Sequence, residues 1–151
     1  MAGLELTDEI REHVNGALMA GNPIIVASVD EEGRPRLSFR GSTQAMSKDQ
    51  LGFWIRNVEG STVQAIRNNP YVALMYRKAG QPVFLQFSGR ARVAEGAERD
   101  RVFDGAPEVE RKADPERKGV AVMVDLDSVE GILGLDAAGQ RRLVRLRRAE
   151  S

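Results

Sequence analysis

The stretch from Gln50 to Pro70 constrains the fold most, because it encodes a strand, a tight turn and a short helix in direct succession. Apolar residues recur at every second position from Leu51 to Ile55, which is typical of a strand with two different faces. The segment Val58–Gly60 can turn sharply. Pro70 cannot continue a helix and also disfavours the helical conformation in the residue before it. The helix after the turn must therefore end by Asn69.

The start of this helix is a candidate binding site. Ser61 and Gln64 have the spacing of a capping box, which predicts that the Ser61 side chain caps the helix. A helix N-terminus presents unpaired amides and a partial positive charge, and it often binds phosphate. Arg56 would add a full charge and a forked set of donors. The alternative, which the local pattern leaves open, is that Ser61 and Thr62 only cap the helix and Arg56 is a solvated strand residue.

Composition excludes several classes of site. Lys plus Arg and Asp plus Glu are 22 each, so the net charge is zero and no global basic field attracts nucleic acid. The chain has no cysteine and a single histidine, His13, which argues against a zinc cluster or a Ser-His-Asp triad. No apolar run approaches about 18 residues. We therefore expect a cytoplasmic protein with no metal site, no nucleic-acid partner and no membrane partner.

The remaining elements are mostly strands. Helices are expected over Leu6–Met19, with Thr7 as N-cap, and as one or two short segments within Glu95–Lys118. Besides the central strand, alternation and β-branched residues predict strands at Ile24–Val29, Pro35 to about Met46, Tyr71–Tyr76, Val83–Ala94 with a bulge at Gly89, Gly119–Leu126 and Arg141–Arg147. The fold class is therefore mainly β (α+β), a small antiparallel barrel of six to seven strands with a few short helices, in one domain over residues 1–151.

A hairpin is expected to bring the second strand beside the central one. If its turn centres between Lys48 and Asp49, paired residues have numbers that sum to about 97. Gly41 then lies opposite Arg56, and Arg40 lies opposite Asn57. The glycine would let a flat ligand approach the backbone.

The order of these elements resembles a known family. The segments that carry the resemblance are IIVASVDEEGRPRLSFRG, FWIRNVEGSTVQAIRNNPYVALMY and FLQFSGRARV, and the most specific piece runs from Ile66 through Asn69-Pro70 to Leu74. They are similar to the FMN-binding split-barrel proteins, the pyridoxamine 5'-phosphate oxidase-like family, over roughly Ile10 to Val93. The resemblance implies a homodimer with FMN at its interface. It also implies that the strand-turn-helix element holds the FMN phosphate, and that the preceding strand lies along the flavin ring.

Carried over by position, the resemblance implies a set of cofactor-binding residues. The ring-contacting strand falls on Ser38, Phe39, Arg40, Gly41, Ser42 and Thr43; the second strand contributes Ile55 and Arg56; the phosphate pair falls on Ser61 and Thr62; and Gln86 would reach the flavin of the other protomer.

The sequence departs from the oxidases at three places. Ser61 and Thr62 replace the usual Arg-Lys pair, so Arg56, with Arg40 as a second candidate, would supply the compensating charge. Phe84 stands near the position of the usual glutamine. The C-terminal tryptophan and Arg-Leu-x-Pro ending are missing, so pyridoxamine phosphate is not the expected substrate.

The resemblance favours an FMN-dependent oxidoreductase that acts on an unidentified small molecule, with no catalytic residue that the sequence singles out. Two alternatives stay open. One is a deazaflavin-dependent reductase on the same fold, and the other is a non-catalytic dimeric module that binds flavin or no ligand.

Overall fold

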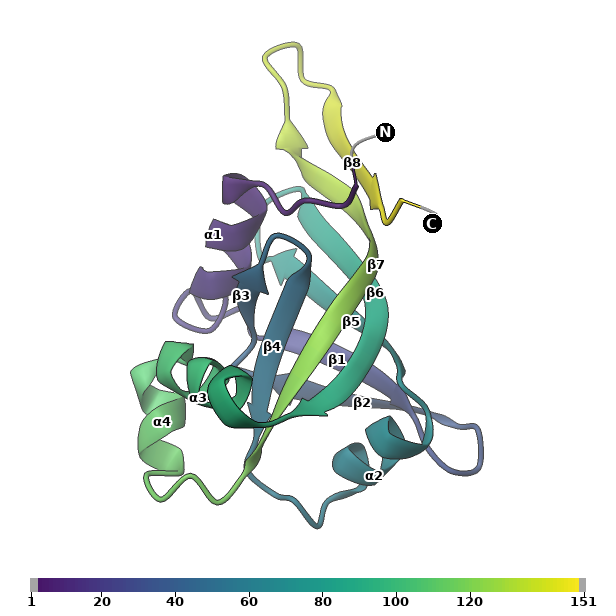
Figure 1. Ribbon diagram of the computed structural model, residues 1–151. Coiled ribbons are helices and arrows are strands. Elements are labelled where there is room, and N and C mark those ends of the chain that lie inside the picture. The colour runs from purple at the N-terminus through teal and green to yellow at the C-terminus, as the bar shows by residue number, and fades with distance from the viewer. Residues whose placement is uncertain (1–2, 150–151) are drawn as a thin grey trace.

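The computed structural model describes residues 3–149, which form eight strands and four helices (Figure 1). In chain order these are α1 (Asp8–Gly16), β1 (Ile24–Val29), β2 (Pro35–Arg40), β3 (Gln44–Ser47), β4 (Gln50–Ile55), α2 (Ser61–Asn68), β5 (Tyr71–Lys78), β6 (Val83–Ala94), α3 (Gly96–Gly105), α4 (Glu108–Ala113), β7 (Val120–Leu135) and β8 (Arg141–Arg147).

The strands form one antiparallel sheet that curls into an incomplete barrel. Its order is β2-β1-β5-β6-β7-β4-β3, with β8 paired to β7. The edge strands β2 and β3 are consecutive in the chain, yet β2 pairs with β1 and β3 pairs with β4. The barrel is therefore split between them, and the prediction of an antiparallel split barrel is confirmed. The structure has eight strands rather than the expected six to seven, because the strand expected from Pro35 to about Met46 is divided into β2 and β3.

That division occurs at a turn from Arg40 to Thr43. The amide and the hydroxyl of Thr43 both donate to the Arg40 carbonyl, at 3.2 and 2.8 Å. The prediction of one continuous strand from Pro35 to Met46 is therefore wrong, because Gly41, Ser42 and Thr43 form a turn that redirects the chain from one sheet edge to the other.

The predicted hairpin register is also wrong near the site. Gln44 lies opposite Gly52 and Ala45 opposite Leu51, so paired numbers sum to 96, and the register shifts between Ala45 and Ser47. The ladder ends at Gln44. Gly41 and Arg40 therefore have no ladder partner on β4.

Strand β4 is buried on both faces, which explains its strong apolar pattern. Leu51, Phe53 and Ile55 point into the main barrel core. On the other face Trp54 packs in a second core with Val102 and Phe103 of α3. Figure 1 shows α3 beside β4 and outside the barrel, with α4 next to α3. The alternation predicted for this strand is confirmed.

Helices α1 and α2 lie where they were expected, but the predicted cap of α2 is wrong. The Thr7 hydroxyl accepts from the Ile10 amide at 3.3 Å, as predicted, although α1 is shorter than the expected Leu6–Met19. In α2 the N-cap is Gly60, which has no side chain to bond. Ser61 is already the first helical residue, so the capping-box prediction is wrong.

The two longest strands carry the bulge and the projecting end of the barrel. The register between β6 and β7 shifts at Gly89, as predicted. A Cβ there would lie 2.4 Å from the Asp125 carbonyl oxygen, so only glycine fits without a shift of the backbone. β7 continues past its predicted end at Leu126 and forms with β8 a hairpin that projects from the barrel (Figure 1).

Within residues 3–149, no helix is long and apolar enough to cross a membrane. The same residues contain no group of three or more His, Cys, Asp or Glu side chains placed to hold a metal ion.

Candidate functional site

A pocket of about 230 Å³ opens where the barrel is split. It lies between the end of β2, the turn after it, the end of β4 and helix α4. We call it the Arg40 pocket, and its lining residues are Phe39, Arg40, Gly41, Ser42, Trp54, Arg56, Asn57 and Glu110.

Arg40 connects this pocket to the start of α2. Its Nη2 donates to the Thr62 hydroxyl at 2.9 Å. Its Nε is buried and has no hydrogen-bond partner within residues 3–149. A buried donor without an acceptor costs about 1–3 kcal/mol, so the site is suited to a ligand that supplies an acceptor.

The charges around Arg40 come from two neighbours. Burial, followed by the positive charge of Arg56, lowers the pKa of Arg40, and the Glu110 carboxylate opposes this. Two guanidinium groups therefore share one small pocket, next to the positive end of the α2 dipole. Such an arrangement favours an anionic group.

The hydroxyl groups of Ser42 and Thr43 in the turn bond to backbone atoms of the pocket wall, so they are already engaged within the protein. The Ser42 hydroxyl accepts from the Trp54 amide at 2.8 Å and donates to the Trp54 carbonyl at 3.1 Å. It thereby takes the place of ladder bonds between the turn and β4. The Thr43 hydroxyl is bound to the Arg40 carbonyl.

The loop from β4 to α2 is set by Asn57. Its side-chain oxygen accepts from the Glu59 amide at 3.1 Å, and its carbonyl accepts from the Gly60 amide at 3.1 Å. This turn brings the exposed Arg56 to the pocket rim and directs the chain into α2.

The structure brings together Phe39, Arg40, Gly41, Ser42 and Arg56 of the predicted set, with Thr62 joined through Arg40. It is Arg40, rather than Arg56, that bonds to the start of α2.

The other predicted residues lie elsewhere. Ser38 is half-buried in β2, where it pairs with Val26 of β1. Thr43 is buried in the turn. The Ile55 side chain is in the barrel core, which leaves only its backbone for a ligand. Ser61 lines a separate hollow that also contains Asp30, Glu31 and Glu32.

Sequence reasoning assigned no role to three lining residues. Trp54 was expected on the face opposite Leu51 and Phe53, and its Nε1 donates to Asp114 at 2.8 Å, which anchors the pocket wall to the loop after α4. Asn57 precedes the turn and carries a recognisable turn-forming side chain. Glu110 lies in a charged segment with no motif, so no local pattern pointed to it.

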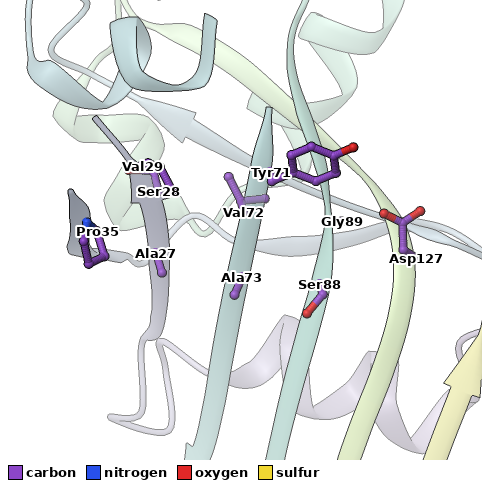
Figure 2. A pocket seen from close by; sticks show the side chains of 10 residues that line it. All are labelled: Ala27, Ser28, Val29, Pro35, Tyr71, Val72, Ala73, Ser88, Gly89 and Asp127. Carbon is purple, nitrogen blue, oxygen red and sulfur yellow. The ribbon is translucent and has the colours of Figure 1, made fainter. Parts of the chain in front are cut away.

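A second, apolar surface lies on the sheet outside the barrel. A hollow of about 350 Å³ lies there. Figure 2 shows its small side chains, such as Ala27 and Ala73, across β1 and β5, with Asp127 on β7 at its edge. An adjoining hollow of about 420 Å³ shares both alanines and includes Gln86. Leu37 and Phe39 of β2 are 75% and 67% exposed on this side of the molecule.

The fold is thus a split antiparallel β-barrel with two arginine side chains in a pocket at the split. The family model for pyridoxamine 5'-phosphate oxidase matches residues 6–128, and this chain therefore belongs to that family.

Solved structures agree with this fold. An FMN-binding protein from Nostoc punctiforme, related to pyridoxamine 5'-phosphate oxidase, is 11% identical with a TM-score of 0.65, and the match covers 96% of this chain and all (100%) of that one. PhzG from Burkholderia lata 383, in complex with tetrahydrophenazine-1-carboxylic acid, is 12% identical with a TM-score of 0.65, over 88% of this chain and 81% of that one. HupZ from Group A Streptococcus is 19% identical with a TM-score of 0.62, and the match covers 91% of this chain and 98% of that one. A search of curated protein sequences finds no significant match.

Proposed function

We propose that this protein is a single FMN-binding domain that functions as a flavin-dependent oxidoreductase on a small molecule. Membership of the pyridoxamine 5'-phosphate oxidase family supports the proposal, as does the structural likeness to an FMN-binding protein. The observation that carries it is Arg40, whose buried Nε lacks an acceptor while its Nη2 bonds to Thr62 at the start of α2.

The residues present fit a phosphate group. Arg40, the Thr62 hydroxyl and the first amides of α2 would hold the FMN phosphate, and Arg56 would add charge at the rim. These groups replace the pair of cations expected at positions 61 and 62. Bound FMN would supply the hydride chemistry, and the protein would bind and orient it.

The proposal includes a homodimer. Leu37, Phe39, Tyr71 and Met75 are large apolar side chains that lie exposed on β2 and β5. An exposed apolar face of this kind commonly marks a protein interface. Phe39 also lines the Arg40 pocket, so a second copy that covers this face would lie next to the cofactor. Gln86 of that copy would then be close to the flavin.

Sedimentation tests the assembly directly. We expect a dimer of the 16.6 kDa chain at micromolar concentration. A stable folded monomer that binds FMN would contradict the shared site but leave the Arg40 contact intact.

The cofactor is tested by colour and titration. We expect the purified protein, or cofactor-free protein mixed with FMN, to show a bound flavin spectrum, and denaturation to release FMN rather than a deazaflavin. Arg40→Ala should weaken FMN binding about tenfold or more, because a hydrogen bond to a charged group contributes about 1.5–3 kcal/mol.

Arg67→Ala is the matched control, since Arg67 is an exposed arginine in the last turn of the same helix. It should leave FMN affinity within about twofold of wild type, because an exposed charge at the far end of the helix is well screened. Equal FMN affinities in wild type and Arg40→Ala would refute the proposed phosphate position. Absence of FMN binding by wild type would refute the proposed function.

A further inference from the structure

Helix α4 places one of its acidic side chains in the Arg40 pocket. Glu108, at the start of the helix, pairs with Lys112 at 3.0 Å on the exposed surface. Glu110 instead turns inward and is half-buried. Its Oε1 lies 2.7 Å from the position that a Cβ on Gly41 would occupy. The absence of a side chain at Gly41 is what allows the carboxylate to rest on the backbone there.

The Glu110 carboxylate makes no close ion pair with another residue of the part of the chain that the structure describes. Within residues 3–149, no Lys, Arg or His nitrogen lies within 4.0 Å of its carboxylate. Arg111, the next residue, is bound to the carbonyls of Asp104 and Ala106 and is turned away. Glu110 does act on Arg40 at longer range: burial and the charge of Arg56 lower the pKa of that guanidinium, and the Glu110 charge opposes this lowering.

The pocket therefore has two ends with different charge. At one end Arg40 and Thr62 meet the start of α2, where an anionic group is favoured. At the other end Glu110 lies on Gly41 and repels a second anionic group, with an energy that falls with distance and with added salt. A ligand that offers an N–H donor or an ammonium group at this end would gain a partner instead.

We propose that Glu110 is a specificity-determining residue, which admits one anionic group at the Arg40–Thr62 end and disfavours a second at the Gly41 end. The inference rests on the proposed anion site. It makes the ligand class a molecule with a single anionic group at the Arg40–Thr62 end and a neutral or amine-bearing group at the Gly41 end, rather than one with two anionic groups.

The test compares inorganic phosphate with pyrophosphate, which carries a second phosphate group. Both are titrated calorimetrically into cofactor-free wild type, Glu110→Gln and Glu108→Gln. Glutamine keeps the shape of the side chain and removes its charge, and Glu108 is the control acid on the same helix. We expect Glu110→Gln to raise the pyrophosphate-to-phosphate affinity ratio about threefold or more at low salt, with a smaller rise at high salt. Glu108→Gln should leave the ratio unchanged.

The outcomes separate this inference from the proposed function. An equal ratio in wild type and Glu110→Gln would overturn the role of Glu110, even if wild type binds FMN. Failure of all three proteins to bind either anion would overturn it as well. An increase in the ratio for Glu110→Gln alone would support it, even if a separate titration of wild type with FMN showed no binding.

Discussion

Asp114 allows the sharpest test of how the pocket wall is held. The side chain is 7% exposed, and it accepts hydrogen bonds from Trp54 Nε1 at 2.8 Å, from the Lys118 amide at 3.0 Å and from the Gly119 amide at 2.8 Å. Asp114→Ala would remove all three acceptor contacts. The Trp54 and Gly119 donors are buried, so water cannot readily replace the carboxylate there.

The expected cost follows from these two donors. Each buried donor left without an acceptor costs about 1–3 kcal/mol, so Asp114→Ala should lose about 2–6 kcal/mol of unfolding free energy. In a protein of this size that loss corresponds to a decrease of about 5–20 °C in Tm. Urea denaturation measures the free energy directly. Asp100→Ala is the control, because the ion pair that Asp100 makes within residues 3–149, with Arg117 at 3.5 Å, is exposed. Its removal should cost under about 1 kcal/mol.

The same carboxylate should give a pH dependence of known sign. Burial works to raise the pKa of Asp114, but hydrogen bonds from Lys118, Trp54 and Gly119 outweigh it, and the pKa lies below the ordinary value of 3.8. The ionised form therefore stabilises the fold above that ordinary value, and this contribution is lost as the pH falls through the lowered pKa. The difference between wild type and Asp114→Ala should shrink in acid. A difference below about 1 kcal/mol at neutral pH would refute the reasoning.

Three further predictions concern separate parts of the chain. Arg56→Ala should leave the Tm of the cofactor-free protein unchanged, because Arg56 is exposed, but reduce the increase in Tm given by FMN; equal increases at several FMN concentrations would make it a solvated residue. Gly89→Ala should cost about 1–3 kcal/mol in urea denaturation, since its Cβ would meet the Asp125 carbonyl oxygen at 2.4 Å, whereas Gly16→Ala, with open space around it, should not. Burial, followed by the charge of Lys78, lowers the pKa of His13 from 6.5, so its stabilising contribution is present above that value and lost as the pH falls below it. His13→Gln should flatten the pH dependence of stability in that range, and parallel curves for the two proteins would contradict this.

Strands with a clear alternation could be predicted from the sequence to the residue. The predicted bounds Ile24–Val29, Val83–Ala94 and Arg141–Arg147 are those of β1, β6 and β8, because turn residues bound each segment and either β-branched residues or an alternating pattern fill it. The alternation also continues through the turn after Arg40, and a pattern along the chain does not record which sheet edge each half joins. For that reason the sequence did not predict the break between β2 and β3, nor the pairing of Gln44 with Gly52 in the hairpin of β3 and β4.

The candidate site was predictable only where its residues are close in the chain. Arg40, Gly41 and Ser42 adjoin one another, and Arg56 and Thr62 flank one turn, so the family resemblance could be carried over to both groups by position. Glu110 reaches Gly41 only because α3 and α4 fold back beside β4, which is a tertiary contact between distant segments. The bond from Arg40 to Thr62 joins residues 22 positions apart in the chain, so no local pattern pointed to it.

The turn between β2 and β3 also determines how freely the pocket can be changed. β2 takes its register from β1 and β3 takes its register from β4, so neither ladder runs through residues 41–43. An added residue within a continuous hairpin strand would shift or bulge its pairing, but here it would lengthen a loop between two independent edges. Insertions at this point should alter ligand choice and leave barrel stability intact, provided that a hydroxyl still reaches the Trp54 backbone as Ser42 does. The pocket wall of this barrel can therefore be engineered as a loop, although strands lie on both sides of it.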